Sequence, residues 1–190
     1  MSMTAVLVFG GRRVPRCLAG LSRGDLDALE PGMTRLIVVG GHCDLAAVLT
    51  ALLRADRLDI EVGFVPRWRP GAARRAKTGS AHRVPLIRDE TGSVIVRRAR
   101  WLPASGPTLT GEAVVDDTVL FDGAARYLQI EPLAAQPGLR ARVAGGHWVT
   151  GRAAQLGTTG ALVQRDGITA ARPVRRSTFY RHVQGWLRIG

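Results

Sequence analysis

The sequence predicts a small parallel α/β sheet unit at residues 1–88, followed by an antiparallel β-sandwich-like unit at residues 89–190. In the first part, short apolar runs alternate with one helical pattern, whereas the helical period disappears after about residue 88. The later runs are β-rich and are separated by turn sequences at short intervals, as is typical of sandwiches or open barrels. With 190 residues, of which 46% are apolar, the chain is long enough to bury a core.

Three apolar runs, 5–9, 34–39 and 60–65, are the expected strands of the first unit. The first two runs stop at glycine pairs and the third stops at Pro66. A helix is expected from Asp44, whose side chain would cap the first turn, to about Arg54. Continuous apolar strands connected through a helix imply a parallel sheet that is covered on both faces.

The second unit is expected to consist of short strands connected by turns such as Asp122-Gly123 and Asp166-Gly167. The expected strands are 94–101, 113–121, 126–131, 148–156 and 161–164. The tail at 177–189 alternates aromatic and basic residues. We expect it to form a final strand that packs back on the first unit.

The net charge of +12 favours anionic partners, but it does not identify a nucleic-acid binder. Lys77 is the only lysine and the other 26 basic residues are arginines, a bias that GC-rich coding alone would produce. The arginines are spread over the chain and do not gather in one stripe. Because arginine binds phosphates and carboxylates in a bidentate manner, the expected partner is an anionic small molecule.

The composition also excludes several classes of protein. The longest apolar run has about nine residues, far fewer than the roughly 20 that a membrane span needs. Cys17 and Cys43 are too far apart for a disulfide framework or a CxxC metal site. No signal peptide is recognised, and the expected location is therefore the cytoplasm.

Three segments in order resemble the diacylglycerol kinase-like family, which includes lipid kinases and is more distantly related to NAD kinases. Residues 34–45, TRLIVVGGHCDL, resemble the apolar strand, GGDGT turn and helix of that family. Residues 62–66, followed by 72–75, resemble its strand that ends in a PLGTxNDFAR-type segment. Residues 164–168, QRDGI, resemble its late DGE motif. The resemblance covers most of the chain at low identity.

The resemblance implies transfer of a phosphoryl group from ATP to a lipid hydroxyl, with Mg²⁺ as cofactor. A diglycine turn lets the backbone approach phosphates, and the amides of the following helix face the anion. In this sequence Gly40, Gly41 and the amides near Asp44 would hold the phosphate. Asp166 would be the remaining family carboxylate for binding metal or accepting a proton.

The departures from the family motifs indicate that this chemistry is weakened or lost. His42 replaces the family Asp of the GGDGT motif, and Cys43 and Asp44 replace its next Gly and Thr. Trp68, Arg69, Pro70 and Gly71 occupy the stretch that carries the Gly, Thr, Asn and Asp of the second motif. Ile168 replaces the Glu of the third motif, and an isoleucine can neither bind a metal nor take a proton.

The expected binding residues of the nucleotide are therefore concentrated at two loops that follow strands. They are Gly40, Gly41, His42, Asp44, Arg67, Trp68 and Arg69. In this interpretation Arg67 and Arg69 clamp an anionic group and Trp68 provides a stacking face. An exposed basic loop and a plain βα turn are the structural alternatives.

Two other chemistries stay open at the start of the helix, although no metal site is predicted. His42, Cys43 and Asp44 could ligate a transition metal with one of His82, His147 and His182, but three adjacent side chains converge poorly on one ion. Cys43 at a helix N-terminus is a conceivable nucleophile, but the sequence shows no partner base.

The sequence thus favours a divergent diacylglycerol kinase-like protein that binds a nucleotide or a lipid head group, with weakened or lost phosphotransfer. Peripheral contact with a membrane is compatible with a lipid ligand. The first alternative is an active lipid kinase, and the second is an Arg-rich nucleic-acid-binding protein, whose affinity would fall steeply with salt.

Overall fold

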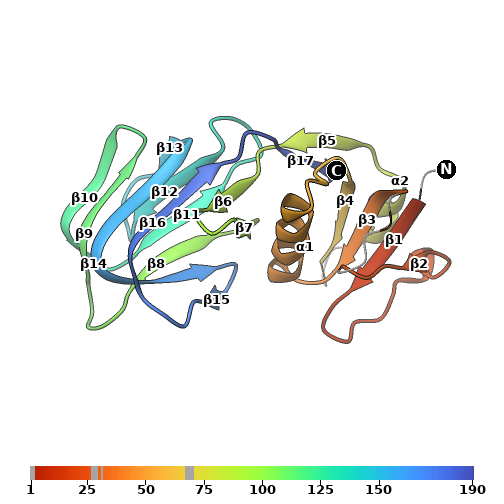
Figure 1. Ribbon diagram of the computed structural model, residues 1–190, viewed down its shortest axis with the longest axis horizontal. Helices are drawn as coiled ribbons and strands as arrows, with labels where there is room; N and C mark the ends of the chain where they lie inside the picture. Colours follow the sequence, from red (N-terminus) through yellow and green to blue (C-terminus); the bar gives the residue numbers. More distant parts are fainter. Residues whose placement is uncertain (1–2, 27–29, 31, 67–70) are drawn as a thin grey trace. The chain divides into compact units, whose positions relative to one another are not determined.

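A computed structural model of the chain describes residues 3–26, 30, 32–66 and 71–190 (Figure 1). The chain divides into two compact units. The first contains Met1–Val84 together with Gln184–Gly190, and the second contains Pro85–Val183.

The first unit is built on a sheet of six strands, sheet A, in the order β2-β1-β3-β4-β17-β5. The strands are β1 (Met3–Val8), β2 (Ser22–Arg23), β3 (Met33–Val39), β4 (Glu61–Val65), β5 (Ala81–Val84) and β17 (Trp186–Ile189). The first five strands in this order are mutually parallel, and only β5 runs antiparallel to its neighbour. The predicted parallel α/β sheet is therefore confirmed.

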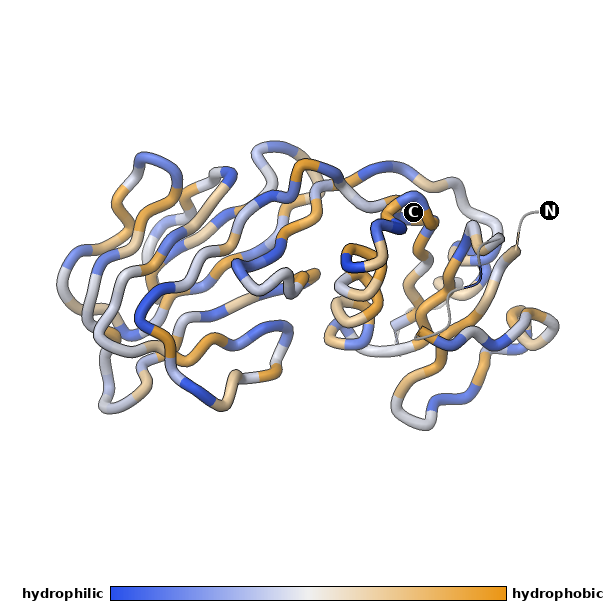
Figure 2. Tube along the Cα trace, in the orientation of Figure 1, coloured by the Kyte–Doolittle hydropathy of each residue, from blue (hydrophilic) through white to orange (hydrophobic). Residues whose placement is uncertain are grey.

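Helices cover sheet A on both faces, as the continuous apolar strands predict. They are α1 (His42–Arg54), α2 (Ala72–Thr78) and the short 3₁₀ helix η1 (Arg16–Leu18). Ile37 and Val39 of β3 pack with Leu18 of η1 and Ala76 of α2, whereas α1 lies on the other side of the sheet (Figure 1). Hydrophobic residues run along β1, β3 and α1 (Figure 2).

The structure differs from the sequence prediction at both helices of this unit. Helix α1 begins at His42 with Gly41 as its N-cap, so Asp44 occupies the third helical position and is not the cap. Helix α2 was not predicted, because its buried side chains are only the alanines Ala72 and Ala76. Two small apolar residues give no hydrophobic periodicity that could indicate a helix.

The second unit is an antiparallel sheet of eleven strands, sheet B, folded into two layers. The strands are β6 (Ile87–Asp89), β7 (Val94–Ile95), β8 (Ala99–Pro103), β9 (Leu109–Val115), β10 (Thr118–Ala125), β11 (Leu128–Pro132), β12 (Leu139–Val143), β13 (Val149–Gly151), β14 (Ala153–Arg165), β15 (Ile168–Thr169) and β16 (Val174–Arg181). One layer has the order β10-β9-β14-β16-β6-β7 and the other β15-β14-β8-β11-β12-β13. The predicted sandwich-like unit is confirmed.

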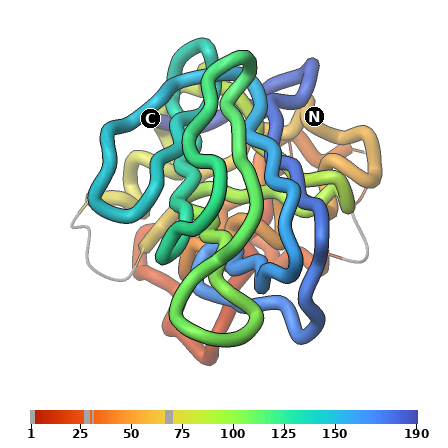
Figure 3. The backbone as a smooth tube through the Cα atoms, turned by 90° about the vertical axis from the view of Figure 1, so that its left-hand side faces the viewer, coloured from red at the N-terminus to blue at the C-terminus, as the bar shows by residue number. Residues whose placement is uncertain are grey.

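Strand β14 belongs to both layers, because its two halves pair with different strands along one edge. Residues 154–158 pair with β9, and residues 161–165 pair with β8. The β9–β10 hairpin, green in Figure 3, lies beside the blue β14. The sequence predicted two separate strands, 148–156 and 161–164. The structure instead continues one strand through residues 157–160.

Other predicted strands are also divided differently in the structure. The run 113–121 is broken by a turn at Asp116-Asp117, where Asp116 has a φ of 49°. The run 94–101 is broken between β7 and β8. The tail at 177–189 is not one strand: β16 belongs to sheet B, and β17 pairs with β4 and β5 in sheet A.

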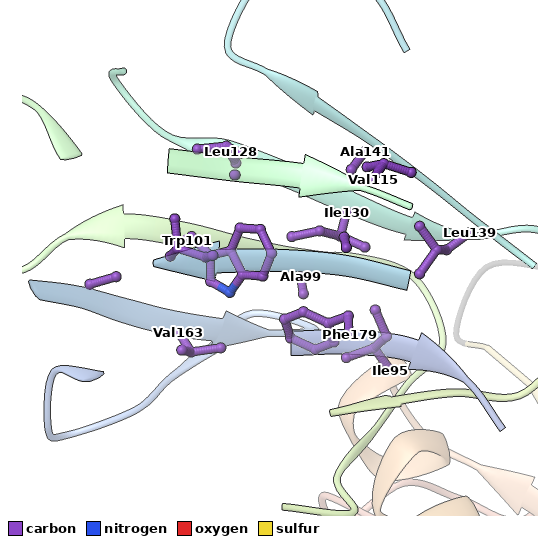
Figure 4. Packing of buried hydrophobic residues seen from close by; sticks show 14 of the residues in the cluster. Ile95, Ala99, Trp101, Val115, Leu128, Ile130, Leu139, Ala141, Val163 and Phe179 are labelled. Atoms are coloured by element: carbon purple, nitrogen blue, oxygen red, sulfur yellow. The ribbon is translucent and has the colours of Figure 1, made fainter. Parts of the chain in front are cut away.

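The core of the second unit lies between the two layers (Figure 4). Trp101 of β8 and Phe179 of β16 are both fully buried, and their ring centroids lie 5.8 Å apart. Small and branched residues fill the space around this pair. They include Ile95, Ala99, Val115, Leu128, Ile130, Leu139, Ala141 and Val163. No helix among the described residues has both the length and the apolar character that a membrane span requires.

One buried carboxylate stabilises the turn between β6 and β7. Asp89 is fully buried and forms an ion pair with Arg165 at the end of β14. Its Oδ1 also accepts hydrogen bonds from the amides of Thr91 (2.9 Å) and Ser93 (3.0 Å). The charge is therefore satisfied on both oxygens, as burial of a carboxylate requires.

We expect Asp89→Ala to lower the free energy of unfolding by about 3 kcal/mol, because it leaves the Arg165 guanidinium without its carboxylate partner. Urea-induced unfolding followed by circular dichroism measures this. Asp122→Ala, at an exposed position of β10, is the control and should change stability by less than about 0.5 kcal/mol. Equal effects of the two substitutions would contradict the role of Asp89.

Candidate functional site

Two diglycine turns meet at one edge of sheet A. Strands β1 and β3 are parallel neighbours, with Val8 opposite Val39. Gly10-Gly11 follows β1 and Gly40-Gly41 follows β3. The carboxyl ends of parallel strands lie at the same edge, which is where open α/β sheets bind their ligands. The sequence identified both glycine pairs but did not predict that they are neighbours.

The Gly40-Gly41 turn is closed by the side chain of Asp44. Its Oδ2 accepts a hydrogen bond of 2.7 Å from the amide of Gly41, which is the N-cap of α1. The same carboxylate lies against Gly40, where an added Cβ would be 2.7 Å from Oδ2. A larger residue at position 40 would therefore clash with Asp44. A Cβ on Gly41 would make only ordinary contacts, the nearest at 3.6 Å.

Arg12 brings a positive charge to this turn. Its Nη1 donates a hydrogen bond of 2.7 Å to the carbonyl oxygen of Gly40. Its Nη2 lies 3.9 Å from the position that a Cβ on Gly41 would take. Arg12 is not among the site residues predicted from the sequence. Its part in the site follows from the parallel pairing of β1 with β3, which no local motif reveals.

His42 and Cys43 form the first turn of α1 with Asp44. The His42 ring lies 5.3 Å from the Phe64 ring of β4, measured between centroids. The Cys43 Sγ lies 3.9 Å from Asp44 Oδ1. Within the described part of the chain, no group of three or more His, Cys, Asp or Glu side chains is arranged to hold a metal ion. The metal-binding alternative thus has no support from this arrangement.

The second predicted loop lies only partly within the description. Arg67, Trp68 and Arg69 lie outside the described residues. The strand that precedes them, β4, is parallel to β3 and pairs Val65 with Val39. The amide of Gly40 also donates to the carbonyl oxygen of Val65, at 3.4 Å. The carboxyl end of β4 therefore lies at the same edge as the two diglycine turns.

Asp166 lies in the second unit, in the turn between β14 and β15, with a φ of 47°. Its carboxylate accepts three hydrogen bonds from backbone amides, at 2.8 to 2.9 Å. The donors are Val96, Arg97 and Arg98, which form the break between β7 and β8. Both oxygens thus bind backbone in this structure. The catalytic role of Asp166 stays a prediction.

The residues of the turns do not fit a magnesium ion. Mg²⁺ prefers an octahedron of oxygen ligands and is usually held by one or two carboxylates together with phosphate groups and water. Residues 9–12 and 40–44 contain one carboxylate, Asp44, and it is bonded to the Gly41 amide beside the Arg12 guanidinium. The neighbouring Arg12 guanidinium instead suits an anion.

Comparisons with known proteins identify the fold. No family model matches the chain, and no curated protein matches it. An NAD kinase from Archaeoglobus fulgidus in complex with ATP superposes with a TM-score of 0.68 at 11% identity, covering 100% of this chain and 94% of that chain. Yeast NADH kinase complexed with NADH gives 0.62 at 9% identity, covering 90% and 66%. The predicted two-unit fold is confirmed, since both kinases superpose on most of this chain. Membership of the diacylglycerol kinase-like family stays a prediction. The closer relation to lipid kinases stays a prediction.

We expect Gly40→Ala to destabilise the first unit by about 2 kcal/mol or more, because the new Cβ displaces Asp44 from the N-terminus of α1. Gly41→Ala is the matched control on the adjacent residue and should cost less than about 1 kcal/mol. Urea titrations of the two variants and the unmodified protein measure both values. A greater loss in Gly41→Ala would contradict the assigned role of Asp44.

A second pair of variants tests the amide contacts of Asp166. We expect Asp166→Ala to lower the free energy of unfolding by about 2 kcal/mol, because three backbone amides lose their acceptor. Asp166→Asn should lose less, since asparagine keeps one acceptor oxygen and tolerates the left-handed conformation. Unchanged stability in both variants would show that these hydrogen bonds are unimportant.

Proposed function

We propose that this chain is a divergent member of the diacylglycerol kinase-like fold that binds a nucleotide or a phosphorylated lipid head group, with ATP-dependent phosphotransfer weakened or lost. The binding site in this proposal is the edge of sheet A at Gly40, Gly41, His42 and Asp44, extended by the Arg67–Arg69 loop. The observation that carries the proposal is the Arg12 guanidinium at the Gly40 carbonyl, beside Gly41.

The charge at this edge supports an anionic ligand. Arg12 uses Nη1 to bind the Gly40 carbonyl, so its orientation is fixed before any ligand arrives. A fixed guanidinium loses little conformational freedom on binding a phosphate, which favours affinity. Arg67 and Arg69 are the further cations that follow β4 in the sequence.

An adenine nucleotide is the first ligand to test. The Archaeoglobus fulgidus NAD kinase was crystallised with ATP and the yeast NADH kinase with NADH, and both ligands carry phosphates next to an adenosine. These enzymes share only the fold with this chain, so the ligand is carried over as a hypothesis. A phosphorylated lipid head group offers the same phosphate chemistry to the turn and forms the second arm of the test.

The residues of the turn support weakened phosphotransfer. Phosphoryl transfer depends on carboxylates that hold Mg²⁺ and orient the attacking group. In this chain His42 and Ile168 occupy positions where the family motifs carry acids, and Asp44 is already bonded to Gly41. An active lipid kinase would need acids from elsewhere in the chain.

We expect ATP to raise the melting temperature of the unmodified protein, because a ligand that binds only the folded state stabilises it. Arg12→Gln and Gly41→Glu should each weaken ATP binding at least about tenfold, the first by removing a charged donor and the second by adding an anion. Calorimetric titration with ATP, with and without Mg²⁺, and then with a phosphorylated lipid head group measures these affinities.

The control is Arg54→Gln, at an exposed position at the far end of α1, which should bind ATP as the unmodified protein does. Equal affinity in all variants would place the ligand elsewhere. Transfer of radiolabel from ATP to diacylglycerol or to NAD by the unmodified protein would contradict the loss of phosphotransfer and leave the binding proposal standing.

A further inference from the structure

The outer face of sheet B carries a row of polar residues across neighbouring strands. Gln129 of β11 is paired with Arg142 of β12 on one side and with Arg100 of β8 on the other. Directly paired residues point to the same face of an antiparallel sheet. The residues that alternate with them in β11, Leu128 and Ile130, are fully buried in the core. The polar row therefore faces away from the core.

Two arginines of this face have no carboxylate partner in the part of the chain that the structure describes. Glu131 accepts hydrogen bonds from Nε and Nη2 of Arg140 through Oε2, at 3.0 and 2.6 Å. Its Oε1 accepts a hydrogen bond of 2.6 Å from Gln129. Glu131 thus neutralises Arg140, and among the described residues neither Arg100 nor Arg142 forms an ion pair.

Aromatic rings hold both arginines in place. The guanidinium carbon of Arg100 lies 5.2 Å from the ring centroid of Tyr127. That of Arg142 lies 4.3 Å from the ring centroid of Trp148, which Arg140 also contacts. Such cation–π contacts use the flat face of a guanidinium and fix its orientation. The N–H groups point outward in the plane of the guanidinium and stay available to an acceptor.

A buried donor marks the same place independently. The Nε atom of Arg100 is buried and has no hydrogen-bond partner among the residues that the structure describes. A buried polar atom without a partner costs free energy, and more so when it belongs to a charged group. Trp101 Nε1 and Ser177 Oγ are also buried without a partner among the described residues, but Arg100 Nε belongs to the charged group of the polar row, where an acceptor from a ligand would satisfy it.

From these observations we infer that Arg100 and Arg142 form a binding site for the phosphate groups of a small anionic ligand on the second unit. Each guanidinium can donate two parallel hydrogen bonds to phosphate oxygens. The two arginines flank one strand, so their Cα atoms are separated by about two strand spacings, roughly 10 Å. We take a diphosphate as the ligand class, because its two phosphate groups offer each guanidinium acceptor oxygens of its own. The site contains none of the residues of the proposed nucleotide site in the first unit.

The test follows the indole N–H resonance of Trp148 in ¹⁵N-labelled full-length protein during titration with inorganic pyrophosphate at constant ionic strength. Trp148→Phe assigns the resonance among those of the four tryptophans. We expect saturable movement of this resonance, with affinity at least about tenfold weaker in Arg100→Gln and in Arg142→Gln. Arg100→Lys and Arg142→Lys, which keep the charge, should still weaken binding because the bidentate geometry is lost.

Arg97→Gln, which removes one exposed positive charge outside this row, is the control for net charge. It and Arg12→Gln should leave the titration of Trp148 unchanged, so that failure of this site and failure of the first-unit site are distinguishable. A resonance that does not move, or equal weakening by Arg97→Gln, would overturn the inference. If circular dichroism shows that a glutamine variant is unfolded, the affinity of the matching lysine variant for pyrophosphate decides the test.

Discussion

The pairing of β14 is the interaction on which the second unit depends. All of its pairing is antiparallel: β16 and β15 share one edge, and β9 and β8 share the other. A single strand therefore connects the two layers through covalent bonds as well as hydrogen bonds. The Trp101–Phe179 contact lies between these layers. The ion pair of Asp89 with Arg165 links the end of β14 to the end of β6. The polar row with Arg100 and Arg142 also depends on it, since β8 is aligned by β14.

Two aspartates perform the same structural task in this unit. Asp116 and Asp166 both have a positive φ, and the carboxylates of both accept hydrogen bonds from backbone amides of a neighbouring segment. Asp116 binds the amides of Arg152 and Ala153, and Asp166 binds those at residues 96–98. Aspartate tolerates the left-handed conformation and supplies a charged acceptor, so it suits such turns. The turn predicted at Asp166-Gly167 is therefore present, whereas the turn predicted at Asp122-Gly123 was wrong, because both residues lie within β10 and pair with β9.

The sequence predicted the architecture because patterning and turn chemistry determine it locally. The apolar runs before Gly10 and Gly40, and the loss of helical period after residue 88, were enough to predict both kinds of sheet. It did not predict α2, whose buried face consists of alanines, or the continuity of β14 through Gly157 and Gly160. Continuity there depends on pairing with β8 and β9, strands distant in sequence, which overrides local turn preference.

The candidate sites were predictable only in part, for a related reason. Gly40 and Gly41 are visible in the sequence because a diglycine after an apolar strand is a local signal. Arg12 reaches the Gly40-Gly41 turn only because β1 and β3 are adjacent and parallel. Arg100 and Arg142 lie in one row only because of the register of β8, β11 and β12. In each place a guanidinium that has no carboxylate partner among the described residues lies where the sheet brings distant segments together. A chain with 26 arginines contains many such candidates, and strand pairing selects among them. The proposals of anion binding therefore rest on the positions of particular arginines and not on the net charge.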